Sequence, residues 1–106
     1  MVDKKFRDAL NNMIEDVGIE EETILLDDHA YDKSIVGITE DGRLIYDLNL
    51  MIQEYAEDEQ CDEIDAIEWI EYNTLRALPY IGERAPIIIL ETRESIMEKY
   101  GGTEHE

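Results

Sequence analysis

The dipeptide Asp41-Gly42 constrains this chain more than any other short segment. It separates two apolar runs of similar length, Ser34–Thr39 and Arg43–Asp47. Glycine adopts positive φ at little cost, and an Asp-Gly pair between apolar runs is typical of a tight β-hairpin turn. The sequence therefore predicts that the two runs pair as antiparallel strands.

Helical periodicity flanks this hairpin on both sides. Apolar residues recur every three or four positions between residues 6 and 17, where Asp3 is suited to cap a helix and Gly18 to end it. We expect three further helices to begin after Asp47, Asp62 and Thr92, each of which can accept a hydrogen bond from the first helical turn.

Two segments near the C-terminal end complete the fold prediction. Pro79 should end the third helix near Leu78, because proline lacks an N–H and disfavours helix just before itself. The run Ile87–Leu90 is short and branched, which predicts a strand buried on both faces, inside the sheet or under a helix. The fold class is therefore α+β: a small sheet, made of the hairpin and a short strand, packed with about four helices.

The length of 106 residues predicts a single domain over residues 1–106, with residues 101–106 as a loose tail. Cys61 has no disulfide partner, and one cysteine with two histidines gives no zinc spacing. The charged N-terminal residues do not resemble a signal peptide, and no apolar run is long enough for a membrane span. We therefore expect a cytoplasmic protein without a cofactor. Because the sequence contains no recognisable nucleotide or catalytic motif, we also expect a protein that is not an enzyme.

The net charge of −19 is concentrated in the middle of the chain. Residues 19–71 contain eighteen acids and only two bases, whereas residues 72–100 contain four of each. Such a negative field repels nucleic acids and anionic membranes and attracts a basic protein surface. We therefore expect no direct nucleic-acid or membrane partner.

The densest acidic run, residues 54–71, has nine acids and no base. Carboxylates three or four residues apart on a helix lie about 5–6 Å from each other, which is on the scale of successive backbone phosphates. The run could therefore imitate a nucleic-acid strand, or it could simply be a solvated helix face. The candidate partner-binding acids are Glu54, Glu57, Asp58, Glu59, Asp62, Glu63, Asp65 and Glu68.

The third predicted helix has two distinct sides on a helical wheel. The apolar side contains Ile64, Ile67, Ile70, Leu75 and Leu78, with Glu71 in its middle. Either this carboxylate has a basic partner or a position in water, or its pKa is raised for acid–base work. Another side carries Trp69, Tyr72 and Arg76, which are residue types that dominate binding interfaces. They are candidate anchors for a partner, although Trp69 could instead pack in a second core.

A second acidic group lies before the hairpin and consists of Asp27, Asp28, His29 and Asp32. Carboxylates suit divalent cations, but this spacing lacks the regular alternation and the distal glutamate of a calcium loop. We therefore expect no tight metal binding here, and a metal-dependent enzyme built on these residues is the least favoured alternative.

Two segments, residues 27–59 and 66–89, resemble a family of short acidic proteins from Firmicutes and their phages. The pattern pairs a YDxSIxGxTxDGRxxYD hairpin with an AIExIxYNTxRALPY helix. The matching positions are Tyr31, Asp32, Gly42, Arg43, Asp47, Tyr72, Asn73, Thr74, Arg76, Pro79 and Tyr80. The resemblance implies a bacterial or phage setting and assigns no role to these residues.

Two hypotheses for function follow. The first is an acidic protein-binding module of the kind that a phage uses as an inhibitor, which mimics nucleic acid and blocks a DNA- or RNA-binding enzyme such as a CRISPR nuclease. The second is a small structural or regulatory domain, either monomeric or homodimeric, whose acidity serves only solubility.

Overall fold

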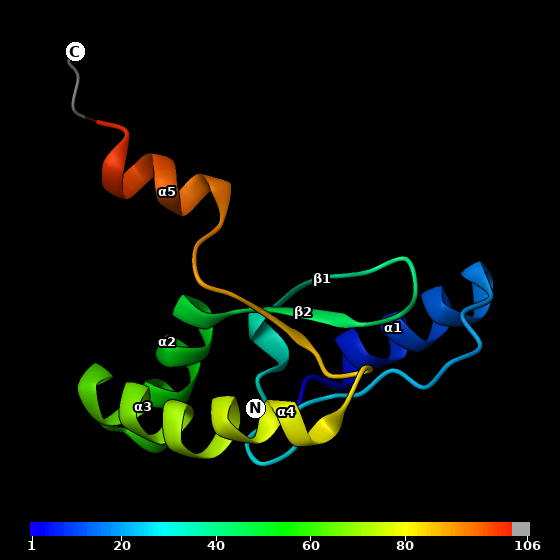
Figure 1. The fold of residues 1–106 in the computed structure, drawn as a ribbon, viewed down its shortest axis with the longest axis horizontal. Coiled ribbons are helices and arrows are strands. Elements are labelled where there is room, and N and C mark those ends of the chain that lie inside the picture. The colour runs from blue at the N-terminus through cyan, green and yellow to red at the C-terminus, as the bar shows by residue number, and fades with distance from the viewer. Residues whose placement is uncertain (103–106) are drawn as a thin grey trace.

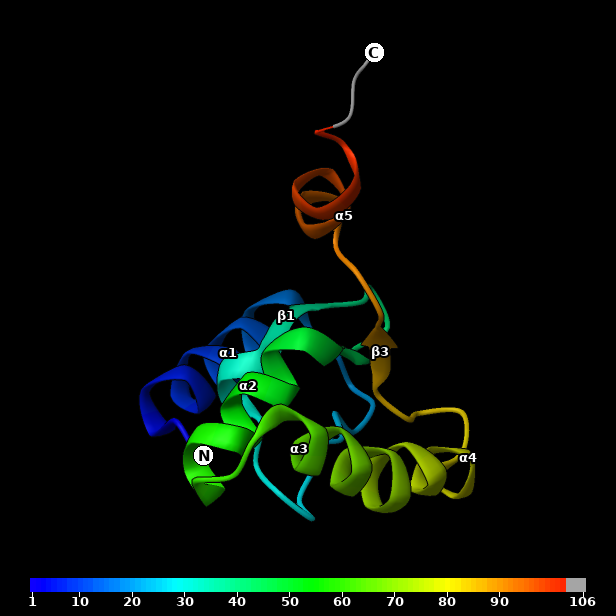
Figure 2. The same cartoon turned by 90° about the vertical axis from the view of Figure 1, so that its left-hand side faces the viewer.

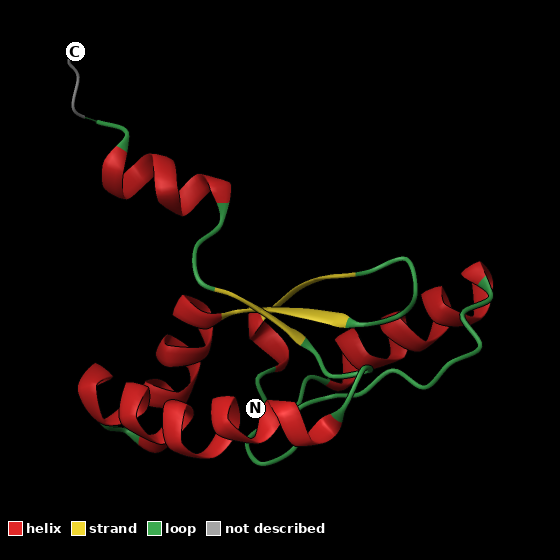
Figure 3. Ribbon diagram, in the orientation of Figure 1, coloured by secondary structure: helices red, strands yellow, loops and turns green. Residues whose placement is uncertain are grey.

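The structure is a computed structural model, and it describes residues 1–102 of the chain. A three-stranded sheet lies at the centre, and the helices surround it, except for the last one, which stands apart (Figures 1 and 3). Within the described residues the α-helices are α1 (Lys4–Val17), α2 (Leu48–Glu59), α3 (Glu63–Trp69), α4 (Leu78–Ile81) and α5 (Arg93–Tyr100). The strands are β1 (Ile35–Ile38), β2 (Leu44–Asp47) and β3 (Ile87–Ile89), and a 3₁₀ turn at Asp32–Ser34 precedes β1.

The predicted α+β fold and its hairpin are confirmed. Strands β1 and β2 are antiparallel, with Ile38 opposite Leu44 and an irregular register between Ile35 and Gly37. The turn contains Gly42 at φ 92°, and a Cβ built there would lie only 2.7 Å from a side-chain atom of Ile19. Glycine is therefore required at this turn both for its conformation and for the close approach of the preceding loop.

The predicted helix caps are confirmed as well. The carboxylates of Asp3, Asp47 and Asp62 accept hydrogen bonds from the first turns of α1, α2 and α3. Thr92 does the same for α5, and Gly18 ends α1 in the left-handed region. These local signals position the helices correctly along the chain because each one satisfies backbone N–H groups that a helix start leaves free.

Strand β3 differs from its prediction. It pairs in parallel with β2, with Ile45 opposite Ile87, and its other side has no neighbouring strand among the described residues. All three of its isoleucines are only half-buried. The run was expected to be buried on both faces, and this was wrong because β3 lies at the edge of the sheet.

The third helix also differs from its prediction. The helical path does not stop before Pro79: α3 is followed by a wide π-helical turn (Ile70–Thr74), a 3₁₀ turn (Leu75–Ala77) and then α4, which has Pro79 in its first turn. Proline is tolerated there because the N–H groups of a first turn have no intrahelical acceptor. The side-chain amide of Asn73, in the wide turn, donates a hydrogen bond to the backbone carbonyl of Trp69 at 3.0 Å.

The buried side of this helix consists of small and medium residues. Ala66, Ile70 and Thr74 are buried, whereas Ile64 and Ile67 are exposed. Glu71 is exposed, which agrees with the alternative that placed this carboxylate in water. The helical wheel was right for Ile70, which is fully buried, and wrong for Ile64 and Ile67; the buried residue within α3 is the small Ala66.

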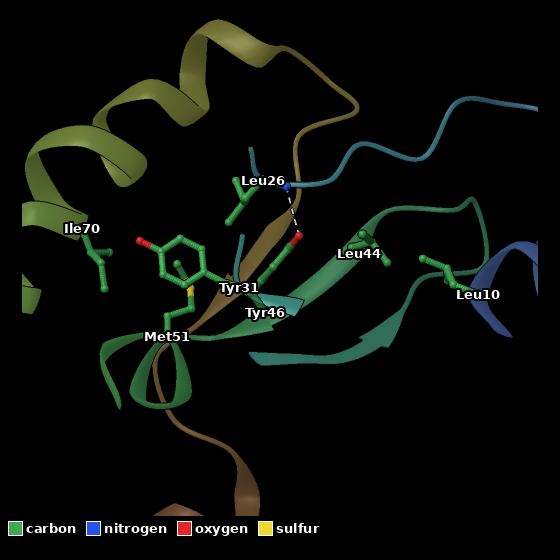
Figure 4. Packing of buried hydrophobic residues seen from close by; sticks show 7 residues of the cluster. All are labelled: Leu10, Leu26, Tyr31, Leu44, Tyr46, Met51 and Ile70. Atoms are coloured by element: carbon green, nitrogen blue, oxygen red, sulfur yellow. Dashed lines mark hydrogen bonds between the residues drawn. The ribbon is translucent and has the colours of Figure 1, made fainter. Parts of the chain in front are cut away.

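The core combines strand β2 and the segment before β1 with residues of α1, α2 and the π-helical turn (Figure 4). Its buried members are Leu10, Leu26, Tyr31, Leu44, Tyr46, Met51 and Ile70. The Leu26 N–H donates to the Tyr46 hydroxyl at 3.0 Å, which fixes the irregular segment after α1 against the sheet. Burial raises the pKa of Tyr46 to about 12, although this hydrogen bond acts in the opposite direction.

A buried ion pair fastens α1 to the segment before β1. The Asp32 carboxylate is fully buried and accepts from Arg7 Nε at 2.6 Å and Arg7 Nη2 at 2.9 Å. The N–H of Asp3 donates to the same carboxylate at 2.8 Å. Burial acts to raise the pKa of Asp32, but the Arg7 and Asp3 hydrogen bonds outweigh it and lower this pKa.

Candidate partner-binding surface

The acidic run folds into the second half of α2, a tight turn and α3. Gln60 takes the left-handed conformation that ends α2, and Asp62 then caps α3 two residues later. The two helices pack against each other as a hairpin. This arrangement brings carboxylates from both helices to one end of the molecule.

Six carboxylates of this helical hairpin are exposed, and we call them the acidic surface. They are Glu57, Glu59, Asp62, Glu63, Asp65 and Glu68. Within residues 1–102, none of them forms an ion pair with a lysine or arginine; only Glu59 lies near a histidine, at 4.0 Å from His29. Their charges are therefore available to an approaching partner.

Glu54, by contrast, lies inside the protein. Its side chain is 6% exposed, and the Ser34 hydroxyl donates to its Oε1 at 2.9 Å. The ammonium group of Met1 lies 2.8 Å from Oε2. Glu54 therefore holds α2 against the segments that precede it, and we leave it out of the acidic surface.

Asp58 is also occupied by contacts within the fold. Its Oδ2 lies 3.0 Å from the Met1 ammonium and 3.0 Å from His29 Nε2, and the side chain is 16% exposed. Burial acts to raise the pKa of Asp58, but the hydrogen bonds from these two groups outweigh it and lower this pKa. Asp58 is thus a structural acid at the margin of the acidic surface.

Trp69 belongs to an aromatic cluster between α2 and α3. Its ring stacks on Tyr55, with centroids 4.8 Å apart and an interplanar angle of 24°. The His29 ring meets the edge of Trp69 at 6.2 Å and lies 4.9 Å from the ring of Tyr55. Trp69 is half-buried, so much of its surface contributes to packing within the chain and only part is open to a partner.

Tyr72 and Arg76 are exposed beside the acidic surface. The Arg76 guanidinium lies over the Tyr72 ring at 5.1 Å, and Tyr72 is 69% exposed. Both line a shallow depression together with Asp65, Glu68 and Glu71. This depression is the place where carboxylates and candidate anchor side chains come together.

Not all members of the acidic surface share this depression. Glu63 instead lines a second groove, which also contains Leu50 and Ile67. Tyr80 is a further exposed aromatic residue in α4, with 91% of its surface open, and the sequence interpretation missed it because it ended the third helix near Leu78. The spacing of Tyr72, Arg76 and Tyr80 at four-residue intervals is the signal that could have identified it.

Three of the four candidate metal ligands before the hairpin have different partners, and the fourth, Asp27, is exposed. Asp32 pairs with Arg7, His29 contacts Asp58, and Asp28 accepts from the Thr74 hydroxyl at 2.7 Å. Within residues 1–102, no group of three or more His, Cys, Asp or Glu side chains is arranged to hold a metal ion. Each of these three residues has a structural contact that explains its position.

Comparison of the chain with models of protein families, with curated proteins and with solved structures finds no match. Among the described residues, no helix is long and apolar enough to cross a membrane.

Proposed function

We propose that this chain is an acidic protein-binding module that inhibits a nucleic-acid-binding enzyme by occupying its basic groove. The observation that carries the proposal is the acidic surface itself, whose six exposed carboxylates have no lysine or arginine partner within residues 1–102. A domain that needed charge only for solubility would be served equally well by acids spread along its whole length. Here the bases lie elsewhere, where Arg7, Arg84 and Lys99 are used in ion pairs.

In this proposal two kinds of residue contribute to binding: the exposed carboxylates and a few large anchor side chains. Carboxylates on two adjacent helices form a negative surface that attracts a basic groove and speeds the encounter. Affinity then depends on a few large side chains that become buried in the complex. Tyr72 and Arg76 are in the right place for this role because they border Asp65 and Glu68 in the shallow depression.

The resemblance to short acidic phage and Firmicutes proteins suggests the class of target. Phages benefit from blocking the nucleases that bacteria direct against them, and such nucleases bind DNA or RNA in positively charged channels. A CRISPR nuclease of a Firmicutes host is therefore the proposed target. In this proposal the chain binds protein only and performs no catalysis.

The test compares two variants with the same net charge. The first converts five members of the acidic surface to amides: Glu57→Gln, Asp62→Asn, Glu63→Gln, Asp65→Asn and Glu68→Gln. Asparagine at position 62 retains the cap of α3 because its side-chain oxygen accepts in the same way. The control converts five exposed acids elsewhere: Glu15→Gln, Asp16→Asn, Glu20→Gln, Glu22→Gln and Glu40→Gln. Both variants change the net charge from −19 to −14.

The readout is plasmid interference by a panel of RNA-guided nucleases from Firmicutes, followed, for any nuclease that is blocked, by a gel-shift assay of its DNA binding and by surface plasmon resonance, which measures its rate of association with the chain. We expect the wild-type chain and the control to block interference and DNA binding by at least one nuclease. The acidic-surface variant should associate at least about tenfold more slowly at low salt, with a weaker salt dependence. If no nuclease is blocked, or if both variants lose the same activity, the proposed mimicry is wrong.

A further inference from the structure

Helix α5 stands away from the rest of the protein, and Figures 1 and 2 show this separation from two directions. It has eight residues, and an isolated helix of that length is marginal in water even with good capping. Large apolar side chains on α5 and just before it are nevertheless exposed: Leu90, Ile96, Met97 and Tyr100. These four residues, which we call the arm residues, need a surface to cover them.

A second group of exposed apolar side chains lies on the body of the molecule. Val36 in β1, Leu50 in α2 and Ile64 and Ile67 in α3 form this group, which we call the body patch. Three of them, Val36, Leu50 and Ile67, line a groove of about 720 Å³ that lies between the body of the molecule and α5. An apolar patch of this kind marks an interaction site more often than a scattered surface residue does.

The groove is not filled by the arm residues of the same chain. The side chains that α5 presents to it are polar: Glu94, Ser95, Glu98 and Lys99. The position of α5 is fixed by hydrogen bonds at its base, where the Asn49 amide donates to the Leu90 carbonyl at 3.3 Å and to Glu91 at 3.2 Å. Within one copy, therefore, the arm residues and the body patch do not cover each other.

The charge of the arm favours a second copy of this chain as its partner. Helix α5 contains Arg93, Glu94, Glu98 and Lys99 and is neutral, whereas the whole chain has a net charge of −19. A basic protein is attracted to the acidic surface by its charge, but the neutral helix α5 adds no electrostatic attraction for such a partner. Arg93 is exposed and forms no ion pair within the described residues. In a dimer it can pair with the carboxylate of Glu63, which lines the groove of the other copy.

From these observations we infer that the chain forms a symmetric dimer in which α5 of each copy covers the body patch of the other. A reciprocal exchange of this kind is closed, because each copy contributes one arm and one patch, and no third copy is required. The dimer shares Glu63 with the acidic surface, but the depression with Tyr72 and Arg76, where the proposed anchors lie, contains none of the arm or patch residues.

The experiment measures the molar mass of the full chain by sedimentation equilibrium between micromolar and millimolar concentration. We expect a transition from 12.4 kDa to twice that mass, and a tighter dimer at higher salt because salt screens the repulsion between two chains of −19. This salt response is opposite to that expected for capture of a basic partner, so the two proposals fail or succeed separately.

Three single substitutions at exposed positions identify the surface. Met97→Asp changes the arm, Ile67→Asp changes the patch, and Val17→Asp is the control at the end of α1. Each of the first two should raise the dissociation constant at least about tenfold per altered contact, which is about a hundredfold for a dimer with two such contacts. The control should leave the dissociation constant unchanged, and circular dichroism should show the same helix content in all three variants.

A mixture of the arm variant and the patch variant provides the decisive measurement. The intact arm of the Ile67→Asp chain can cover the intact patch of the Met97→Asp chain, so one of the two contacts is restored. Native mass spectrometry with one variant labelled with ¹⁵N should therefore show mixed dimers in excess of either homodimer. The inference is wrong if the wild-type chain remains a monomer at millimolar concentration, if the dimer is insensitive to both substitutions, or if mixing restores no dimer.

Discussion

Replacing Arg7 with methionine tests whether the buried ion pair with Asp32 holds α1 on the protein. The substitution removes two of the three hydrogen bonds to a fully buried carboxylate, those at 2.6 and 2.9 Å, and leaves only the bond from the Asp3 N–H. Breaking a buried pair by removing one partner costs about 3–5 kcal/mol, because the remaining charge is left without compensation. Arg7 is itself 31% exposed, so water can enter the vacated space, and we expect the lower end of this range.

A loss of about 3 kcal/mol corresponds to a fall in Tm of about 12–20 °C for a domain of this size. The assay is urea unfolding followed by circular dichroism, because urea does not screen charges. Lys4→Met is the matched control on the same helix, since Lys4 pairs with Asp8 at 2.9 Å on the open surface. An exposed pair contributes at most about 1 kcal/mol, so this control should unfold close to the wild-type midpoint.

The pH dependence provides an independent check on the same reasoning. In the wild-type protein the pKa of Asp32 is lowered, so its contribution to stability is present above the unfolded value of about 3.9 and is lost as the pH falls through the folded value. Without Arg7, burial dominates and raises this pKa, so protonation stabilises the variant as the pH falls. The difference in unfolding free energy between the two proteins should therefore shrink from pH 7 to pH 4.5.

The result that would refute this reasoning is a small and constant difference. If Arg7→Met lowers the free energy of unfolding by less than about 1 kcal/mol at both pH values, the pair does not stabilise the fold. A double variant, Arg7→Met with Asp32→Asn, adds a further criterion. It should be more stable than Arg7→Met alone, because it no longer buries an uncompensated charge.

Three further substitutions test other parts of the fold by urea unfolding. Gly42→Ala should cost at least about 2 kcal/mol, and more than Gly82→Ala, because both positions have positive φ but only the first lacks room for a Cβ; equal losses would contradict the steric argument. Tyr46→Phe should cost about 1–3 kcal/mol by removing the acceptor of the Leu26 N–H. Since burial raises the pKa of Tyr46 to about 12, the wild-type protein should also lose more stability than this variant as the pH rises from about 10 to 12; the variant still contains Tyr31, whose pKa burial also raises. Trp69→Ala should lower the free energy of unfolding by about 2–3 kcal/mol, as expected for a half-buried aromatic ring, and unchanged stability would assign this ring to a partner alone.

The sequence predicts the local elements of this fold well, for a reason visible in its capping residues. Asp3, Asp47, Asp62 and Thr92 each satisfy backbone N–H groups within three residues of themselves. Such interactions depend on neighbouring residues only, so they can be recognised without knowing the tertiary structure. The hairpin at Gly42 is local in the same sense.

Predictions that depend on packing between distant segments were less successful. The wheel drawn for residues 62–78 assumed a regular α-helix, whereas the chain widens into a π-helical turn after Trp69 and tightens into a 3₁₀ turn after Thr74. The wheel placed Ile70 correctly in the core, but it also placed Ile64 and Ile67 there, whereas the buried residue of α3 is Ala66. The edge position of β3 could not be recognised because nothing in the run Ile87–Leu90 shows how many neighbours a strand has.

For the candidate binding residues too, features that depend on local properties were predicted and features that depend on distant contacts were not. Exposure of Glu57, Asp65 and Glu68 follows from the simple expectation that charges lie in water. Burial of Glu54 depends on Ser34 and on the Met1 ammonium, which are 20 and 53 residues away in the chain. Contacts between residues so far apart in the chain cannot be predicted from the residues next to Glu54 in the sequence.

The parallel pairing of β2 with β3 has a consequence for how the chain is made. Residues 48–86 separate the two strands, so the ribosome must deliver all of them before β3 can reach its place. Until then the hairpin has an open edge with unpaired backbone groups, and such an edge can join to the same edge of another nascent chain. Ten acids lie between residues 48 and 86 and emerge during this interval, and their like charges repel neighbouring unfinished chains. The acidity that we assign to recognition in the finished protein thus also protects the protein during its synthesis.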